Sequence, residues 1–482
     1  MRRSLWVLFL AAVFAAGYPG PARAEPVAPA ATAPGKTALE RELDRLAAWV
    51  EKEKGELTAQ VVEVETRRVL AEKSPALSLN PASNAKVPTA AALLAKLGPD
   101  FRFTSGLYGV VKDGNVERLV LRSNGDPSLS SADLEKLVKA LLDAGVKRVG
   151  EVLVDQSAFD SRFIPPAFEQ QPAEWAPFRA PVSAVSVNGN AFAVSVEPGE
   201  LGQPAKVSVD PAGYVEVEGK LLTEKKGKGR KLSVEMRPNG SALAIRLAGH
   251  VAADAKPQSF AKRVDDPRLF AGFVLRALLK RRGIAVEGGV GEGGKPEKGA
   301  LAEKKSEPLS VLLREVGKSS DNFYAETLLK VLGAETTRRP GASADGAAAV
   351  RGWLESLGAT DAGTKLTNGS GLFDANRLSA ASLVTVHLAA SRDPKFGPAF
   401  LDQLAVGGVD GTLRNRFRGK LAKKVRGKTG TLARAHSLTG LVIGDDGKPR
   451  LAFALVINGI AGKADEQRRR LDRVVERAAA SK

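Results

Sequence analysis

The sequence predicts an α+β protein in which an antiparallel sheet with packed helices carries a long β-rich insertion. Two stretches that alternate apolar and polar residues, 59–71 and 438–457, form hairpin-like patterns near the two ends of the chain. Amphipathic helical patterns flank both hairpins. Between residues 104 and 262 the texture changes to short strand-like segments separated by turn signals, which predicts an inserted domain.

The first 24 residues have the pattern of a signal peptide. Met1-Arg2-Arg3 is positively charged, Leu5 to Ala16 is a short apolar run, and Ala22-Arg23-Ala24 is a small-x-small cleavage site. A run of about twelve apolar residues is too short to span a bilayer stably. We therefore expect an exported, soluble protein that begins at Glu25, with the Pro- and Ala-rich residues 25–36 as a flexible leader.

The next elements are expected in the order helix, hairpin, helix. Thr37 can cap a helix that ends near Gly55. The apolar stripe of this helix comprises Leu39, Leu43, Leu46, Trp49 and Val50. Residues 59–65 and 69–71 then form the hairpin, and the apolar run 90–97 belongs to a helix that starts near Ser83.

The insertion is expected to contain mainly strands, in one or two subdomains, with one helix at 131–144. The strand-like segments are 104–111, 116–122, 150–154, 185–196, 206–217 and 232–247. After the insertion, an amphipathic helix opens at Asp266-Pro267 and the Gly-rich run 288–299 reads as an exposed loop. Further helices are expected at 308–316, 322–332, 342–357 and, closing the chain, 465–480.

Composition excludes several kinds of chemistry. The 482 residues contain no cysteine, which excludes disulfides, thiolate nucleophiles and cysteine-ligated zinc. The three histidines, His250, His387 and His436, lie far apart and lack the spacing of metal ligands. We therefore expect no metal and no cofactor, and a Ser-His-Asp triad is disfavoured.

The chain is basic, with 72 lysine and arginine residues, 54 acidic residues and a net charge of +18. The excess gathers at 225–231, 280–282 and 414–428. Aromatic residues do not alternate with these charges, and export also argues against a nucleic-acid partner. We interpret the clusters as solvated surface, with peripheral attraction to an anionic cell wall or membrane surface as the alternative.

Ser83 and Lys86 are three residues apart at the start of an apolar helix, so the lysine amine can reach the serine hydroxyl. The pair reads as a nucleophile beside its base, and the helix start favours negative charge developing at Ser83. A capping serine with a solvated lysine is the alternative for this motif taken alone. The same spacing recurs at Ser259 and Lys262, which we interpret as a solvated surface turn because no apolar helix follows.

Two further motifs supply what this pair lacks. Ser320-Asp321-Asn322 offers a hydroxyl that can pass a proton to a leaving amine and an amide that can hold a substrate backbone group. Lys428-Thr429-Gly430-Thr431 offers a cation, a hydroxyl and a glycine-opened strand edge on which an extended peptide can lie. S-x-x-K, S-D-N and K-T-G together are the signature of β-lactamases and penicillin-binding proteins.

The chain resembles the class C low-molecular-mass penicillin-binding proteins, the D-alanyl-D-alanine carboxypeptidase/endopeptidases related to penicillin-binding protein 4. The motifs that carry the resemblance lie at 81–86, 98–103, 125–129, 183–190, 318–322, 368–372, 411–417 and 427–432. Two positions depart from the family pattern. Pro88 removes a helix N–H and predicts a kink just past Lys86, and Asn368 replaces the usual aspartate.

The resemblance implies a β-lactamase/transpeptidase-like domain with helices on both sides of its antiparallel sheet. Residues 37–103 and 263–482 would form this catalytic domain, and 104–262 would be the β-rich insertion. The expected location is the periplasm. The expected partners are peptidoglycan peptides that end in D-Ala-D-Ala, with β-lactam antibiotics as inhibitors.

The resemblance also implies residue roles. Lys86, neutralised by burial and neighbouring cations, would take the proton of Ser83, and Ser83 would attack the substrate carbonyl. Ser320 would pass a proton to the leaving D-alanine, and Asn322 would hold the substrate amide. Lys428 and Thr429 would bind the terminal carboxylate, while the backbone N–H groups of Ser83 and Thr431 would form the oxyanion hole. The implied substrate-binding residues are Lys428, Thr429, Gly430 and Thr431.

Two other functions stay open. A serine β-lactamase carries the same three motifs, but the sequence offers no candidate for a dedicated deacylating glutamate. A non-catalytic peptidoglycan-binding protein would keep the fold and lose motif residues, and none is lost here.

Overall fold

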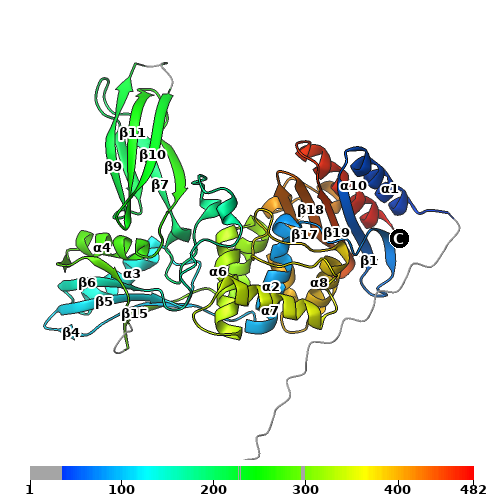
Figure 1. Cartoon of the computed structure of the whole chain (residues 1–482), viewed down its shortest axis with the longest axis horizontal. Helices are drawn as coiled ribbons and strands as arrows, with labels where there is room; N and C mark the ends of the chain where they lie inside the picture. The colour runs from blue at the N-terminus through cyan, green and yellow to red at the C-terminus, as the bar shows by residue number, and fades with distance from the viewer. Residues whose placement is uncertain (1–34, 226, 228–229, 295–298, 482) are drawn as a thin grey trace, which may run out of the picture.

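A computed structural model of the chain describes residues 35–225, 227, 230–294 and 299–481. The molecule is elongated and has two parts, one built around α1 and α10 and the other around β5, β6 and a projecting group of strands (Figure 1). The predicted signal peptide lies outside the described residues, as does the predicted leader apart from Gly35 and Lys36. No helix in the described residues is long and apolar enough to cross a membrane.

The first part is built on a six-stranded antiparallel sheet whose strand order is β16-β17-β18-β19-β1-β2. These strands are β1 (Glu56–Glu63), β2 (Val69–Lys73), β16 (Ala405–Val406), β17 (Val425–Leu432), β18 (Ala435–Ile443) and β19 (Pro449–Asn458). The two predicted hairpins are present and lie side by side, because β1 pairs with β19 along its whole length. One sheet therefore joins the two ends of the chain.

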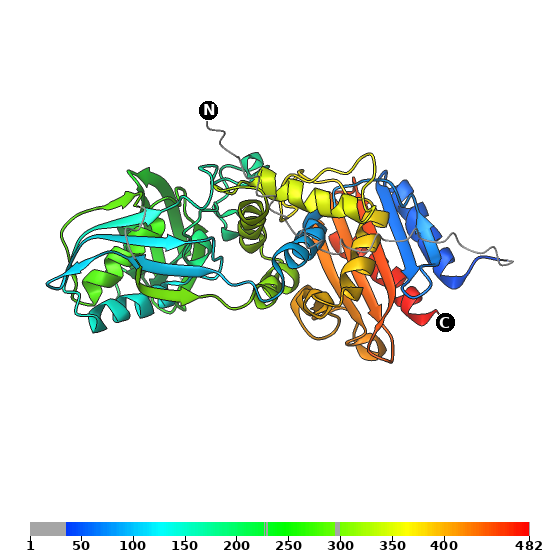
Figure 2. The ribbon, with the colours of Figure 1, turned by 90° about the horizontal axis from the view of Figure 1, so that it is seen from below.

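Helices cover both faces of this sheet (Figure 2). Alternate residues of β1, such as Ala59 and Val61, pack against α1 (Ala38–Lys52) and α10 (Ala464–Ala480). The next residue, Val62, belongs to the core on the opposite face of the sheet. This alternation is what a strand buried on two sides requires. The helices of the opposite face are α2 (Lys86–Leu97), α5 (Leu309–Arg314), α6 (Asn322–Thr336), α7 (Ser343–Ser356), α8 (Ala380–Arg392) and α9 (Gly397–Gln403).

The helix expected after Thr37 illustrates how local sequence sets these elements. The Thr37 side chain accepts a hydrogen bond from the Glu40 N–H, and the Glu40 side chain accepts one from the Thr37 N–H. This reciprocal cap satisfies two backbone donors at the start of α1. The predicted apolar stripe is buried, so the helix packs as expected on the sheet.

The second part contains three sheets that share one hydrophobic core. The largest has the order β13-β6-β5-β3-β15, with β4 and β14 at its margins, and packs against α3 and α4. The other two are β12-β7-β8 and β10-β11-β9, and the last of these projects from the rest (Figure 1). The bounds are β3 (Thr104–Tyr108), β4 (Val111–Lys112), β5 (Asn115–Ser123), α3 (Ser131–Asp143), β6 (Arg148–Asp155), β7 (Ala191–Glu197), β8 (Lys206–Asp210), β9 (Val215–Glu224), β10 (Arg230–Asn239), β11 (Ala242–Ala252), β12 (Gln258–Arg263), α4 (Phe270–Arg281), β13 (Ala285–Val286), β14 (Val290–Glu292) and β15 (Ala300–Lys305).

Four predicted segments of this part differ in detail. In the segment 185–196 the strand begins only at Ala191, after a 3₁₀ turn. The segment 206–217 forms two strands rather than one, with Pro211 between them, where a proline cannot donate to a sheet. The segment 232–247 is a hairpin, not a single strand. The Gly-rich run 288–299 is not simply a loop, because Val290–Glu292 pairs with β6.

The predicted end of the insertion at residue 262 does not match the packing. The helix α4 lies in the core of the second part, and β15 pairs with β3, the first strand of the insertion. The chain passes from the first part to the second at Phe103 and returns at Ser306, and these two residues are hydrogen-bonded to each other. The Phe103 N–H donates to Ser306 Oγ, and the Ser306 N–H donates to the Phe103 carbonyl. We infer that the insertion spans 104–305 and that it leaves and re-enters the first part at one point.

Candidate active site

Ser83 lies in a 3₁₀ turn, η1 (Ala82–Ala85), that leads directly into α2. Pro88 sits in the first turn of α2, where its missing N–H costs little because the first N–H groups of a helix lack intrahelical partners. The kink predicted past Lys86 is therefore not seen. The chain changes from 3₁₀ to α geometry at Lys86 itself, and Lys86 Nζ lies 3.2 Å from Ser83 Oγ.

Lys86 is 1% exposed and has two further partners. Its Nζ donates to Asn322 Oδ1 at 2.7 Å and to the Ser370 carbonyl at 2.7 Å. Both partners can only accept, so they take the two N–H bonds of a neutral amine. The nitrogen lone pair then remains for the hydroxyl proton of Ser83, which is the orientation that a general base needs.

Burial lowers the pKa of Lys86 to about 7, against the opposing charges of Glu326 and Asp321. Below that pH the amine is protonated and cannot accept a proton, and above it the amine is free. We therefore expect the second-order rate of penicillin acylation to rise with pH through about pH 7. Stopped-flow measurements from pH 5 to 9 would check this, and a rate that is flat across the range would mean that Lys86 is not the titrating base.

The Ser320-Asp321-Asn322 motif forms a tight turn before α6. Ser320 has φ +60°, in the left-handed region that a residue with a side chain seldom adopts without a structural reason. Asp321 caps α6, since its Oδ1 accepts from the Tyr324 N–H at 2.9 Å. This turn directs the two flanking side chains to different lysines. Asn322 Oδ1 accepts from Lys86 Nζ, and Ser320 Oγ accepts from Lys428 Nζ at 2.8 Å.

Lys428 and Thr429 lie on β17, at the margin of the sheet beside Ser83. Among the strands that the structure describes, β16 covers only Arg426 and Gly427 of β17, so the edge from Lys428 onward has no second neighbour. Such an edge can accept an extended peptide. Lys428 is 1% exposed, and burial followed by the charge of Lys86 holds its pKa well below the usual range.

Gly430 allows this strand to approach the nucleophile turn. A Cβ at this position would lie 2.2 Å from Ser437 Oγ and 2.7 Å from the Pro81 carbonyl. No side chain fits there, so the glycine of the motif is required for the contact between β17 and η1. The four predicted catalytic residues and the four of the Lys428 motif thus converge on one place.

A buried chain of side chains holds the turn from behind and was not anticipated from the sequence. Asn84 Nδ2 donates to Ser437 Oγ at 2.6 Å, and Ser437 Oγ donates to the Pro81 carbonyl at 2.6 Å. Thr439 Oγ1 donates to Asn84 Oδ1 at 2.8 Å. Ser437 and Thr439 are alternate residues of β18, a spacing that places both on the face toward η1.

The second Ser-x-x-Lys copy does not form such a site. Ser259 and Lys262 lie on β12, so the predicted surface turn is wrong. Residues three apart on a strand point to opposite faces. Ser259 Oγ instead lies 3.1 Å from Ser195 Oγ on the neighbouring strand.

Asn368, the position that departs from the family pattern, makes two hydrogen bonds that an ionised aspartate could not make, because they need an N–H donor. Its Nδ2 donates to the carbonyls of Pro166 and Leu372, at 2.9 and 3.2 Å. Its Oδ1 accepts from the Gly371 N–H at 2.9 Å. The amide therefore ties the insertion-side loop at Pro166 to the turn that presents Ser370 to Lys86.

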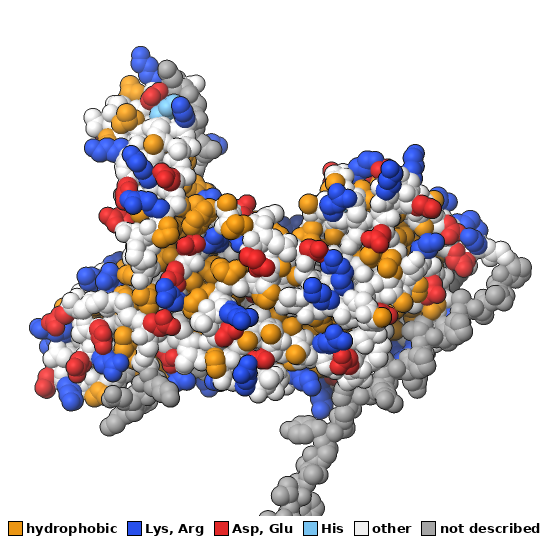
Figure 3. All heavy atoms as spheres, viewed as in Figure 1, with side chains coloured by type: hydrophobic (Ala, Val, Ile, Leu, Met, Phe, Trp, Pro, Cys, Tyr) orange, Lys and Arg blue, Asp and Glu red, His pale blue; other side chains and the backbone are white. Residues whose placement is uncertain are grey.

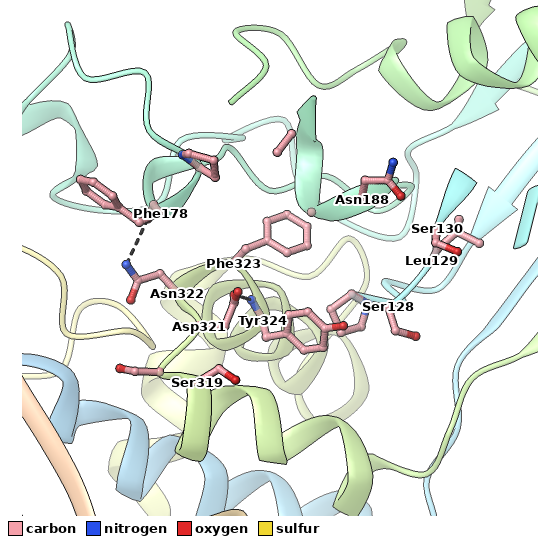
Figure 4. Close-up of a pocket in the computed structure, with 15 residues that line it drawn as sticks. Ser128, Leu129, Ser130, Phe178, Asn188, Ser319, Asp321, Asn322, Phe323 and Tyr324 are labelled. Carbon is pink, nitrogen blue, oxygen red and sulfur yellow. Dashed lines mark hydrogen bonds between the residues drawn. The ribbon is translucent and has the colours of Figure 1, made fainter. Parts of the chain in front are cut away.

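The insertion also forms a wall of the site. The Phe178 carbonyl accepts from Asn322 Nδ2 at 3.0 Å (Figure 4). A pocket of about 420 Å³ opens beside Ser320 and Asn322. The insertion residues that line it are Pro127, Ser128, Leu129, Ser130, Pro177, Phe178, Asn188, Gly189 and Ala191. The catalytic motif and the insertion thus face each other across this pocket.

Comparison with known proteins agrees with the fold. The chain is 35% identical over 425 residues to the D-alanyl-D-alanine carboxypeptidase of Actinomadura sp. (strain R39), which covers 84% of this chain and 78% of the relative. It is 27% identical over 412 residues to D-alanyl-D-alanine carboxypeptidase DacB of Haemophilus influenzae, with 82% and 84% covered. The crystal structure of penicillin binding protein 4 (dacB) from Haemophilus influenzae is similar in fold, with a TM-score of 0.76, 24% identity, and 90% of this chain and 99% of that chain covered.

The match to a sequence family is equally extensive. Residues 39–480 match the D-Ala-D-Ala carboxypeptidase 3 (S13) family, from the first turn of α1 to the end of α10 and across the whole insertion. The chain therefore belongs to the D-Ala-D-Ala carboxypeptidase 3 (S13) family.

Proposed function

We propose that this protein is a serine D-Ala-D-Ala carboxypeptidase, endopeptidase or both, and that it acts on peptidoglycan stem peptides through an acyl-enzyme at Ser83. The observation that carries the proposal is the geometry around Lys86, whose Nζ lies 3.2 Å from Ser83 Oγ and contacts two groups that can only accept. In the neutral amine these two groups would take both N–H bonds and leave the lone pair for the Ser83 hydroxyl. A solvated capping pair would not show this arrangement, because Lys86 is buried. The same geometry supports acylation by β-lactams.

In the proposed acylation step, Ser83 Oγ attacks the carbonyl of the penultimate D-alanine as Lys86 Nζ takes the hydroxyl proton. The tetrahedral intermediate places its oxyanion at the backbone N–H groups of Ser83 and Thr431. The close approach of β17 to η1 at Gly430 supports this role. Ser320, which contacts Lys428, then passes its hydroxyl proton to the leaving amine as the C–N bond breaks. The proton that Lys86 took from Ser83 replaces the one that Ser320 gave up, so Lys86 is neutral again when the ester has formed.

In the second step, water attacks the ester and releases the shortened peptide and free Ser83. A carboxypeptidase and an endopeptidase differ only in the leaving group, which is D-alanine in one case and a second stem peptide in the other. The direct test is mass spectrometry of purified peptidoglycan fragments after incubation with the enzyme. Loss of one alanine or separation of cross-linked fragments supports the proposal, whereas unchanged fragments together with rapid turnover of a chromogenic cephalosporin would indicate a β-lactamase.

The proposed location is the periplasm, supported by the signal-peptide pattern of residues 1–24 and by a substrate that lies in the cell wall. On the face seen in Figure 3, Lys and Arg side chains are spread over both parts with acidic side chains between them. This distribution favours general solvation over a single basic docking patch. Peripheral attraction to an anionic wall or membrane remains a secondary proposal.

Lys428 and Thr429 are proposed to bind the terminal carboxylate of the substrate, and a bound carboxylate would restore the proton that burial disfavours on Lys428. A charge-assisted contact contributes roughly 1.5–3 kcal/mol. We expect Lys428→Ala to lower kcat/KM for a free-acid peptide about ten- to a hundred-fold, and to change the methyl ester of the same peptide little. An equal loss on both substrates would instead assign Lys428 to the proton path through Ser320.

A further inference from the structure

Glu326 is a buried acid in the core beside the candidate site. It lies on α6 one turn after Asn322 and is 1% exposed. Residues four apart lie on the same face of a helix, so Glu326 faces the same side as the side chain that accepts from Lys86. The roles proposed above leave this carboxylate without a function.

The contacts of Glu326 are all hydrogen-bond donors. Its Oε1 accepts from the Ser370 N–H at 2.7 Å and its Oε2 accepts from the Gly369 N–H at 3.2 Å. The Ser370 hydroxyl also donates to it. Burial raises the pKa of the Glu326 carboxyl, while these donors and the charge of Lys86 act in the opposite direction. Because both oxygens face backbone N–H groups that cannot reorient, the hydrogen-bond geometry favours an ionised carboxylate over a carboxylic acid or an amide.

The same turn carries the acceptor of the candidate base. Glu326 binds the N–H of Ser370, and the carbonyl of Ser370 accepts from Lys86 Nζ at 2.7 Å. Helix α6 therefore controls two of the three polar contacts of Lys86, directly through Asn322 and indirectly through Glu326. A shift of this turn would move the acceptor that orients the lone pair of Lys86.

We propose that Glu326 is a positioning residue for Lys86, holding the Ser370 carbonyl against the amine and stabilising with its negative charge the ammonium that forms when Ser83 gives up its proton. This inference rests on the proposed role of Lys86 as the base. Lys86 must be neutral before the attack and protonated after it. A buried lysine beside a second buried lysine, Lys428, needs a nearby negative charge to hold that proton.

The other charges around this pair do not replace Glu326. Asp321 also favours the ammonium form of Lys86, but its contribution is smaller than that of Glu326. Lys330, one turn further along α6, is paired with Asp160 at 2.6 Å. Lys428 acts in the opposite direction, since two neighbouring ammonium groups repel each other. Removing the charge of Glu326 therefore leaves the protonated state of Lys86 less stable.

The test compares Glu326→Gln, which keeps the shape and removes the charge, with Glu326→Asp, which keeps the charge and shortens the side chain. The full chain is used, and the readout is the second-order rate of benzylpenicillin acylation as a function of pH. In Glu326→Gln we expect the rising limb of the acylation rate against pH to move by about one pH unit to lower pH, because the ammonium form of Lys86 loses a stabilising charge. We also expect a lower acylation rate at the high-pH plateau. In Glu326→Asp the limb should stay in place while the plateau falls.

Thr327→Val is the matched control, because Thr327 is a fully buried neighbour on α6 and valine has the same shape. Its limb should not move. If Glu326→Gln folds and the rising limb of its pH–rate profile does not shift, the proposal is overturned. An acid shift of about one pH unit in Glu326→Asp would also overturn it. The Glu326→Asp result decides the question by itself if Glu326→Gln does not fold. These failures differ from failure of the proposed function, which would appear as no acylation of the unmodified protein at any pH.

Discussion

Replacing Ser83 with alanine is expected to abolish the covalent adduct that benzylpenicillin forms with the protein. The substitution removes the oxygen that attacks the carbonyl and leaves Lys86 without a proton to take. Loss of a serine nucleophile costs on the order of 10⁶-fold in kcat in a well-studied serine hydrolase, so hydrolysis of a D-Ala-D-Ala peptide should fall below detection. Intact-protein mass spectrometry measures the adduct directly, as one added penicillin per chain in the unmodified protein.

Ser259→Ala provides the control for this experiment. Ser259 and Lys262 have the same spacing as Ser83 and Lys86, but they lie on a strand and point to opposite faces. We expect this variant to form the adduct at the rate of the unmodified protein. A penicillin-modified peptide that contains Ser259 would show that the nucleophile has been wrongly assigned.

The second large effect concerns Lys86. A positioned general base contributes about 10²- to 10⁴-fold to the rate, so Lys86→Ala should slow acylation by that factor for peptides, esters and β-lactams alike. Lys86→Arg keeps the positive charge, but a guanidinium is not deprotonated in proteins. We expect the arginine variant to be as slow as the alanine variant. Stopped-flow acylation rates, with thermal unfolding as a check on folding, provide the comparison.

Lys86→Ala and Lys86→Arg together show whether Lys86 acts as a proton acceptor or only as a positive charge in the site. A lysine that only neutralised the site would be replaced in part by arginine, and a lysine that only bound one class of substrate would spare the others. Recovery of more than about a tenth of the rate in Lys86→Arg would therefore contradict proton transfer through Lys86.

The candidate site was predicted in the parts that local spacing determines. Ser83 and Lys86 are one turn apart, and Ser320 and Asn322 flank one helix cap, so short motifs were sufficient to find them. The Ser370 carbonyl could not be found in this way, because any residue type offers a backbone carbonyl. Glu326 was missed for a related reason, since one acidic residue inside a helical pattern reads as a solvated position until the fold shows its burial.

The fold was predicted where periodicity is strong and mistaken where pairing is long-range. The capped helix α1 and the hairpin of β18 and β19 follow from local patterns. The end of the insertion could not be predicted from local patterns. The amphipathic pattern of α4 shows that one face is buried, but it does not show which of the two parts the helix packs against. Our inference that α4 and the strands after it belong to the insertion rests on two long-range observations, which are the packing of α4 in the core of the second part and the pairing of β15 with β3.

The pairing of β1 with β19 has a consequence for the order in which the protein matures. The chain is synthesised from its N-terminus, so β1 must wait for β19, the last strand of the described residues, before its side of the sheet can close. The insertion needs only its own residues and can fold earlier. Ser437, Thr439 and Lys428 all arrive near the end, and they hold the nucleophile turn or complete the site. We therefore expect a chain that ends before β17 to lack a complete site and to show no activity.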